Sequence, residues 1–432
     1  MRFTRSSRAV AALAALALTV AACGAEEEAA EETTEATETT EESTDEAPAD
    51  AGSLLLGYLL PETGQLAFLG PPMISGVQLA VQEINDAGGL FGAAVELISA
   101  DEAGDAGRAA EEGNRLLAAG VDAIVGAAST SMTLSVIDAV TSAGVVQCSP
   151  SNTGIGLTTY PDKGYYFRTA PSDVLQAPVL AETILNSGAA NVAVVARADD
   201  YGRPFMEETV ANLESRGATV TLQEAYDPES ATFDSVVEAM LNSGADAYAV
   251  ISFVEGAQIV SGLLAAGVAP TAIFGADGIA GAAFADNFSG PEVLEGMTFT
   301  APTALVPPDF EARLLEFNPD LVDFLFAPNS YDCVNLIALA AVQGGSTDAA
   351  TIRDNMISVS TGDNVCTTFA ECLPFLEAGE TVAYQSSAGG ALNLIEVREG
   401  GGEPSQGTIE VSKWVDGEFT SQGLVTGNLL VD

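Results

Sequence analysis

One hydroxyl-rich segment of the chain carries residues that could bind the carboxylate of a small molecule. Residues Ser129–Thr133 lie between a short apolar run and a predicted helix, and all but one of them are serine or threonine. The N-terminus of a helix presents free backbone N–H groups and the positive end of the helix dipole, which together favour an anion. The hydroxyl groups add further donors. The alternative is that Ser129 or Ser131 only caps the helix.

Two further polar segments follow predicted strands. Residues Ser149–Thr153 form a polar loop, and Asp277 lies in an Ala-Asp-Gly sequence after another apolar run. Both could instead be simple turns, in which serine, proline and aspartate are common. A buried carboxylate can pair with an ammonium group, provided that both desolvated charges find partners. The three segments therefore offer groups for both charges of a zwitterion.

The composition excludes several other kinds of chemistry. The 432-residue chain contains no histidine, which removes histidine-based triads, histidine general bases and histidine-ligated zinc. It contains no GxSxG sequence and no P-loop. Lys and Arg total 14 against 61 Asp and Glu, a net charge of −47, so a nucleic-acid partner is not expected. We predict a protein that is not an enzyme and uses neither a cofactor nor a metal.

The segments that must position these residues alternate between strands and helices. Continuous apolar runs such as Leu54–Leu60 are typical of strands buried on both faces, and the apolar spacing over 74–84 is typical of a helix. The alternation continues to Cys148 and restarts at Asn191. This pattern predicts an α/β fold with two doubly wound parallel sheets. Ligands bind beyond the carboxyl ends of such strands, so two facing units would form a cleft.

The first residues are typical of an export signal. Several arginines precede the apolar run Ala9–Val20, which is shorter than the ~20 residues of a membrane span. Small residues before Cys23 resemble a bacterial lipobox, in which the cysteine is lipidated; the alternative is an ordinary cleavage site. Residues 24–52 are acidic and lack aromatic and basic residues, which predicts a disordered linker. We predict a signal peptide over 1–23 and anchoring to the outer face of the cell membrane through Cys23.

Six short sequences carry a resemblance to a known family. They are Gly64–Ala67, Asn85–Gly89, Ser149–Thr153, Phe167–Thr169, Asp199–Gly202 and Gly275–Gly278. In this order and spacing they resemble the leucine/isoleucine/valine-binding family of periplasmic binding proteins, the receptors of ABC amino-acid importers. The resemblance covers most of residues 54–432.

The resemblance implies the type I periplasmic binding protein fold, with two lobes joined by three crossing segments. The expected N-terminal lobe is 53–170 with 302–388, and the expected C-terminal lobe is 171–301 with 389–432. The third crossing is expected around Tyr384–Leu392. Residues Ala391–Val397 and Thr408–Val415 flank a glycine-rich turn, which predicts a hairpin.

The resemblance also implies a role for each site residue. Thr130 and the backbone N–H of Thr153 would bind the ligand carboxylate, while the Ser151 carbonyl, the Thr153 hydroxyl and Asp277 would bind its ammonium group. Aromatic side chains would cover the ligand, although Tyr201 and Phe253 could instead pack in the core. The full predicted set is Ser129, Thr130, Ser151, Thr153, Tyr201, Phe253, Asp277 and Leu69.

Two arginines lie close to the predicted cleft in a chain with few cations. Arg197 and Arg203 could bind a second acidic group of the ligand, or they could pair with Asp199 and Asp200. The sequence favours the second alternative.

The cysteines predict one disulfide. Cys366 and Cys372 are close in the sequence of an exported chain, which favours a local bridge. Cys148 and Cys333 can pair or stay as buried thiols, and the sequence does not decide between the two.

These observations predict a lipid-anchored extracytoplasmic substrate-binding protein of an ABC importer. Its ligand would be an amino acid of the branched-chain type or a similar small zwitterion, held between two closing lobes. Its partners would be ABC permease subunits, and a monomer is expected. The alternative is a ligand-sensing receptor of the same fold that binds amides, urea or small organic acids.

Overall fold

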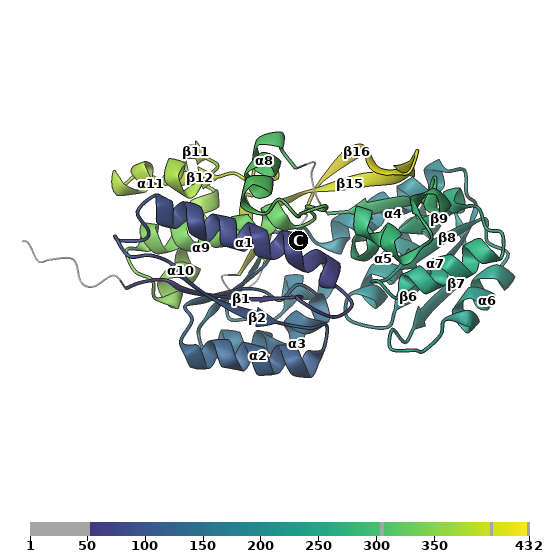
Figure 1. The fold of residues 1–432 in the computed structure, drawn as a ribbon, viewed down its shortest axis with the longest axis horizontal. Coiled ribbons are helices and arrows are strands. Elements are labelled where there is room, and N and C mark those ends of the chain that lie inside the picture. The colour runs from purple at the N-terminus through teal and green to yellow at the C-terminus, as the bar shows by residue number, and fades with distance from the viewer. Residues whose placement is uncertain (1–51, 303–305, 398–400, 430–432) are drawn as a thin grey trace, which may run out of the picture. The chain divides into compact units, whose positions relative to one another are not determined.

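The computed structural model describes residues 52–302, 306–397 and 401–429. Within them the chain forms two seven-stranded sheets with helices on their faces (Figure 1). We call the parts built on these sheets the first and the second lobe. The predicted signal peptide, Cys23 and nearly all of the predicted linker lie outside the described residues. No helix of the described residues combines the length and the apolar character that a membrane span requires.

The first sheet has the strand order β13-β14-β5-β4-β3-β1-β2. Its strands are β1 (Leu55–Leu60), β2 (Glu96–Asp101), β3 (Ala123–Gly126), β4 (Val146–Ser149), β5 (Tyr166–Arg168), β13 (Leu394–Glu396) and β14 (Gly402–Pro404). The strands β1 to β5 are parallel. Both faces are buried, which explains why β1 reads as a continuous apolar run.

The helices of the first lobe cover both faces of this sheet. Helix α1 (Gly70–Asp86) connects β1 to β2. Helix α2 (Ala106–Ala119) connects β2 to β3 and α3 (Thr130–Ser142) connects β3 to β4, both in the opposite direction along the sheet. Crossover connections between parallel strands are right-handed, so this change of direction places α1 on the face opposite α2 and α3 (Figure 1). Helix α9 (Ala327–Gly344) packs beside α1. The loops after β1 and β3 lie at the point where the strand order reverses, which is where ligands bind in such sheets, and the loop after β4 is next to them.

The second sheet repeats this arrangement in the order β16-β15-β10-β9-β8-β6-β7. Its strands are β6 (Asn191–Arg197), β7 (Thr219–Tyr226), β8 (Ala247–Ile251), β9 (Ile273–Gly275), β10 (Thr298–Ala301), β15 (Gln406–Val415) and β16 (Glu418–Asn428). Its helices are α4 (Asp173–Asn186), α5 (Gly202–Ser215), α6 (Asp234–Asn242) and α7 (Gly256–Ala265). The prediction of two doubly wound α/β units is confirmed.

The remaining elements belong mainly to the first lobe. They are α8 (Pro308–Phe317), α10 (Ala349–Asn355), α11 (Phe369–Glu377) and a two-stranded parallel sheet of β11 (Asn364–Cys366) and β12 (Val382–Tyr384). Helices α10 and α11 both pack against α9. Helix α9 is buried over most of its length because it lies between these elements and α1.

The predicted C-terminal hairpin is wrong, and the third crossing lies elsewhere. Strand β13 pairs with β14, which continues the first sheet beside β5, while β15 pairs with β16 in the second sheet. The chain therefore changes sheets between Pro404 and Gln406, and not around Tyr384–Leu392. Strand β14 is three residues long and contains glycine and proline, so it carries no strand pattern.

Two disulfides tie the first lobe together. Cys366, the last residue of β11, and Cys372 of α11 form the local bridge that their spacing predicts. Cys148 of β4 and Cys333 of α9 form a second bridge across 185 residues of chain. The second bridge joins the sheet to its central covering helix, and it answers the question that the sequence leaves open.

Candidate functional site

The loop after β3 presents the N-terminus of α3. The Ser129 hydroxyl accepts a hydrogen bond from the Met132 backbone N–H at 3.2 Å, so Ser129 caps the helix. Thr130 accepts from the backbone N–H of Gly154 at 3.2 Å. Glu102, at the end of β2, accepts from the Ala128 N–H at 2.6 Å, and burial raises the pKa of Glu102 to about 8. The loop is therefore held by its neighbours on both sides.

Hydrogen bonds join this loop to the loop after β4. The Ser151 hydroxyl and the Asn152 amide both donate to the Ala128 carbonyl, at 2.9 and 2.6 Å. The Thr133 hydroxyl donates to the Asn152 side-chain oxygen at 2.5 Å. These side chains are buried. They position the backbone of both loops before any ligand is bound.

A buried ion pair supports the loop after β4. Arg168 of β5 pairs with Glu403 of β14, and both side chains are essentially inaccessible to solvent. The guanidinium also donates to the carbonyls of Asn152 and Gly154, at 3.2 and 3.0 Å. These two residues flank Thr153. Arg168 therefore fixes the segment that presents Thr153.

Asp277 lies two residues beyond the end of β9 in the second lobe and is almost fully buried. Its carboxylate accepts hydrogen bonds from the Tyr201 hydroxyl at 2.7 Å and the Gln176 amide at 3.0 Å. Burial raises the pKa of Asp277 to about 6, although these two hydrogen bonds act in the opposite direction.

A second carboxyl group, that of Asp173, lies close to Asp277 and is not among the residues predicted from the sequence. Asp173 is the first residue of α4 and is fully buried. Burial and the charge of Asp277 raise the pKa of Asp173 well above its usual value, while the Thr153 hydroxyl and Arg168 lower it. Two buried carboxylates so close together create a region that favours a cation. An aspartate at the start of a helix is common, so no local signal sets Asp173 apart.

All the predicted ligand-binding residues line one small cavity between the loops of the two lobes. Its full lining is Leu66, Leu69, Ala128, Ser129, Thr130, Ser151, Thr153, Tyr201, Phe253, Asp277, Gly278 and Phe326. The rings of Tyr201 and Phe253 stack with their centroids 5.3 Å apart. The cavity volume is about 20 Å³, which is roughly the space of one water molecule.

Two large apolar residues of this lining, Leu66 and Phe326, were not predicted. Leu66 belongs to Gly64–Ala67, one of the sequences that carry the family resemblance. This position was the signal that could have identified Leu66 as a cavity residue. Phe326 comes from the segment before α9, far along the chain, and its backbone φ is +61°. This conformation is unusual for a bulky residue and is held by the surrounding structure. No sequence pattern predicts that Phe326 lines the cavity.

The two arginines near the site have different surroundings. Arg197 forms ion pairs with Asp199 and Glu255 and does not line the cavity. Its charge is therefore already matched by carboxylates of its own lobe. Asp200 instead accepts a hydrogen bond from Ser131. Arg203 is exposed on α5.

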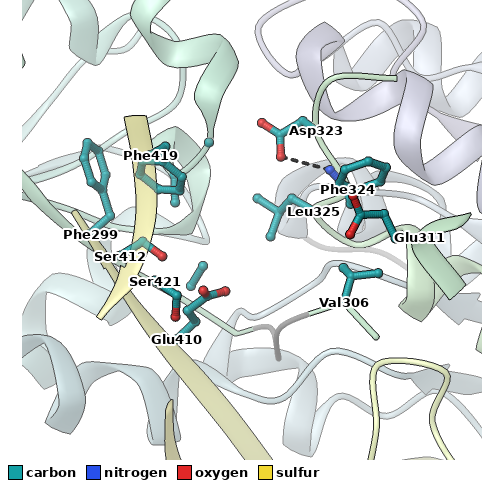
Figure 2. Close-up of a pocket in the computed structure, with 13 residues that line it drawn as sticks. Phe299, Val306, Glu311, Asp323, Phe324, Leu325, Glu410, Ser412, Phe419 and Ser421 are labelled. Atoms are coloured by element: carbon teal, nitrogen blue, oxygen red, sulfur yellow. Dashed lines mark hydrogen bonds between the residues drawn. The ribbon is translucent and has the colours of Figure 1, made fainter. Parts of the chain in front are cut away.

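A larger cavity of about 250 Å³ contains none of the predicted residues (Figure 2). Glu311, Asp323 and Glu410 line it together with phenylalanine side chains, and burial raises the pKa of both Asp323 and Glu410. Asp323 accepts from the Ala282 backbone N–H at 3.0 Å. Among the described residues, no cationic side chain lines this cavity, so they offer little to a ligand carboxylate. Within the described residues, no group of three or more potential ligand side chains could hold a metal ion.

Comparisons with known proteins agree with this geometry. A family model described as "Periplasmic binding protein" matches residues 54–371. The Leu/Ile/Val-binding protein homolog 3 of Brucella melitensis is 30% identical over 201 residues, which cover 46% of this chain and 54% of that relative. The Leu/Ile/Val-binding protein BraC3 of Rhizobium johnstonii is 28% identical over 313 residues, which cover 70% and 83% of the two chains.

Solved structures show the same fold. The branched-chain amino acid transporter substrate-binding protein LivJ from Streptococcus pneumoniae, in complex with isoleucine, superposes with a TM-score of 0.70 at 22% identity. The match covers 88% of this chain and 100% of that one. These relatives are binding proteins and not enzymes, in agreement with the prediction of a non-catalytic protein.

Proposed function

The chain belongs to the periplasmic binding protein family, and from this premise we propose that it binds an amino acid of the branched-chain type for an ABC importer. One observation carries the proposal. A single cavity brings the buried carboxylate of Asp277 from the second lobe opposite Thr130, Thr153 and the N-terminus of α3 from the first lobe. The two sides of the cavity match the two charges of a zwitterion.

The chemistry of each side follows from its groups. The ligand carboxylate would lie at the N-terminus of α3, where the Thr130 hydroxyl and the Thr153 N–H donate to it. The ligand ammonium would lie at Asp277, with the Ser151 carbonyl and Thr153 hydroxyl as further acceptors. The neighbouring carboxyl of Asp173 adds to the preference for a cation there, because a bound ammonium group favours the ionised form of both carboxyls. Leu66, Leu69, Tyr201, Phe253 and Phe326 would surround an apolar side chain.

Binding requires the two lobes to separate and close. Pockets for small molecules are typically ~300–1,000 Å³, whereas this cavity has a volume of about 20 Å³. We propose that residues 53–170 with 302–404 move as one lobe and residues 171–301 with 405–429 as the other. The segments that cross between the sheets would then act as the hinge.

The remaining parts of the proposal concern where the protein works. We also propose export, lipidation of Cys23, docking to ABC permease subunits and a monomeric state. The apolar run that ends at Cys23 supports the first two, and the family match supports the third. The alternative is a ligand-sensing receptor that binds amides, urea or small organic acids, and one binding experiment distinguishes it from the proposed function. Calorimetric titration with the twenty amino acids, their amides and dicarboxylates separates the two. Heat with leucine, isoleucine or valine supports the proposal, and no response to any amino acid contradicts it.

The change of Thr153 to valine should weaken leucine binding by about five- to tenfold, because one hydroxyl hydrogen bond is lost at constant shape. Thr141→Val is the matched control. The Thr141 hydroxyl donates to the Ile137 carbonyl within α3, away from the cavity. Titration calorimetry measures both variants. An unchanged dissociation constant for Thr153→Val would place the ligand elsewhere.

Leucine binding should weaken as the pH falls through about 6, because Asp277 must be ionised to pair with the ammonium group. Its pKa in the free protein is raised to about 6, so below this pH the ligand must displace a proton. The affinity should then fall by up to about tenfold per pH unit. Because Asp173 and Asp277 interact, the apparent pKa belongs to the pair. Titrations between pH 7.5 and 5 test this, and a constant affinity over that range would contradict it.

A further inference from the structure

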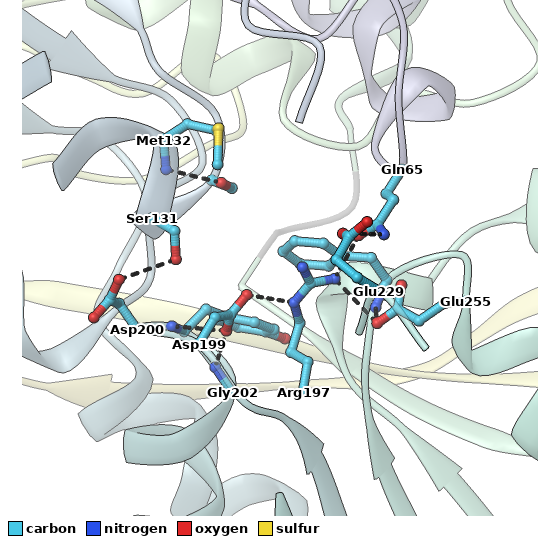
Figure 3. A network of polar contacts seen from close by, with 12 residues as sticks. Gln65, Ser131, Met132, Arg197, Asp199, Asp200, Gly202, Glu229 and Glu255 are labelled. Carbon is cyan, nitrogen blue, oxygen red and sulfur yellow. Dashed lines mark hydrogen bonds and ion pairs between the residues drawn. The ribbon is translucent and has the colours of Figure 1, made fainter. Parts of the chain in front are cut away.

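A polar network at the edge of the cavity joins the two lobes (Figure 3). Gln65 lies on the first-lobe loop after β1, and its side-chain oxygen accepts a hydrogen bond from Arg197 of the second lobe at 3.1 Å. The Gln65 amide donates to Glu229, also of the second lobe, at 3.2 Å. Gln65 therefore meets a donor and an acceptor of the opposite lobe at once. The Ser131–Asp200 hydrogen bond, at 3.1 Å, also crosses between the lobes.

Arg197 is the centre of this network. Its side chain is almost fully buried and forms ion pairs with Asp199 and Glu255. Its guanidinium carbon lies 3.6 Å from the centroid of the Phe253 ring. A cation at this distance over an aromatic face is attracted to it, and the attraction is larger when both are shielded from water. Arg197 thus contacts a face of the Phe253 ring, and Phe253 in turn stacks with Tyr201.

The carboxylate partners of Arg197 fix the backbone of both cavity aromatics. Asp199 accepts from the Tyr201 N–H at 3.1 Å, and Glu255 accepts from the Phe253 N–H at 3.2 Å. Arg197 connects the two carboxylates. A continuous series of contacts therefore leads from Gln65 through Arg197 to Phe253 and Tyr201. The Tyr201 hydroxyl donates to the Asp277 carboxylate, so the series reaches the proposed ammonium site.

We propose that Gln65 and Arg197 form a clasp across the lobes that positions Phe253 and Tyr201 over the bound ligand and slows its release. This inference rests on the proposed function, since it assigns how the same site retains its ligand. These hydrogen bonds cross between the lobes, so a separation of the lobes that releases the ligand would break them. Their loss should therefore raise the rate of ligand dissociation and leave the association rate nearly unchanged.

Gln65→Ala is the variant that tests the clasp, and Gln78→Ala on α1 is its control, an exposed glutamine of the same lobe. Stopped-flow measurements with leucine should show a dissociation rate about five- to tenfold higher for Gln65→Ala, with the association rate within about twofold of wild type. Gln78→Ala should match wild type in both rates. A Gln65→Ala dissociation rate equal to that of Gln78→Ala overturns the clasp.

Hydrogen–deuterium exchange without ligand tests the clasp independently of leucine binding. Amides at the closed interface, around Thr130 and Gly278, should exchange faster in Gln65→Ala than in Gln78→Ala, because the closed arrangement is less populated. Equal exchange in the two variants overturns the clasp. Failure of the wild-type protein to bind leucine would instead contradict the proposed function, and the exchange result would still decide the clasp.

Discussion

Replacing Asp277 with asparagine is expected to weaken leucine binding by about 30-fold or more, because the ligand ammonium would be buried without its counter-ion. Asparagine keeps the size of the side chain and can still accept from Tyr201 and Gln176, so the fold should be preserved. It also removes a buried charge, which carries a desolvation cost in the free protein. Calorimetric titration measures the loss of affinity, and circular dichroism checks the fold.

Asp323→Asn is the control for this variant. Asp323 is another carboxylate with a raised pKa and is partly buried, but it lines the larger cavity and not the small one (Figure 2). Its replacement should leave leucine binding unchanged. If Asp277→Asn lowered the affinity by less than about tenfold, 1.4 kcal/mol, then Asp277 would not be the partner of the ammonium group.

Replacing Arg168 with methionine is expected to destabilise the folded protein by about 3–5 kcal/mol, since it leaves the buried Glu403 carboxylate without its partner. The same change removes the donors of the Asn152 and Gly154 carbonyls. Urea unfolding followed by circular dichroism measures the change in the free energy of unfolding. Because these carbonyls flank Thr153, leucine binding should weaken as well.

Two further variants distinguish this effect from a general loss of an arginine. Arg108→Met removes a partly exposed cation that pairs with Glu111 and Glu112 on α2, and it should cost less than about 1 kcal/mol. The double change Arg168→Met with Glu403→Leu removes both buried charges and should recover much of the stability. If Arg168→Met were as stable as Arg108→Met, the buried pair would not support the loop.

The sequence contains enough information to predict the two sheets and most of the site. Buried parallel strands read as apolar runs, and the segments that follow them are polar, so Ser129–Thr133, Ser149–Thr153 and Asp277 stand out locally. The carboxyl ends of parallel strands meet at one edge, which explains why these separate segments reach one cavity. The roles of Tyr201 and Phe253 depended on the family resemblance, because a buried aromatic has the same local pattern in any core.

Features that depend on distant partners could not be predicted in this way. Arg168 belongs to a string that carries the resemblance, but its partner Glu403 lies 235 residues away in a three-residue strand. The Cys148–Cys333 bridge spans 185 residues, so spacing gives no signal for it. Phe326 reaches the cavity, and Asp173 reaches Asp277, through packing between elements that are distant in the sequence. Strand β16 is rich in polar residues and glycine, so neither alternation nor an apolar run marks it.

A crystal structure of the protein with leucine tests the central claim most directly. We expect the leucine ammonium within hydrogen-bond distance of Asp277 and the leucine carboxylate at the N-terminus of α3, close to Thr130 and Thr153. The Phe253 ring should then cover the leucine side chain. Leucine in the larger cavity of Figure 2, or bound with its carboxylate towards Asp277, would contradict the claim.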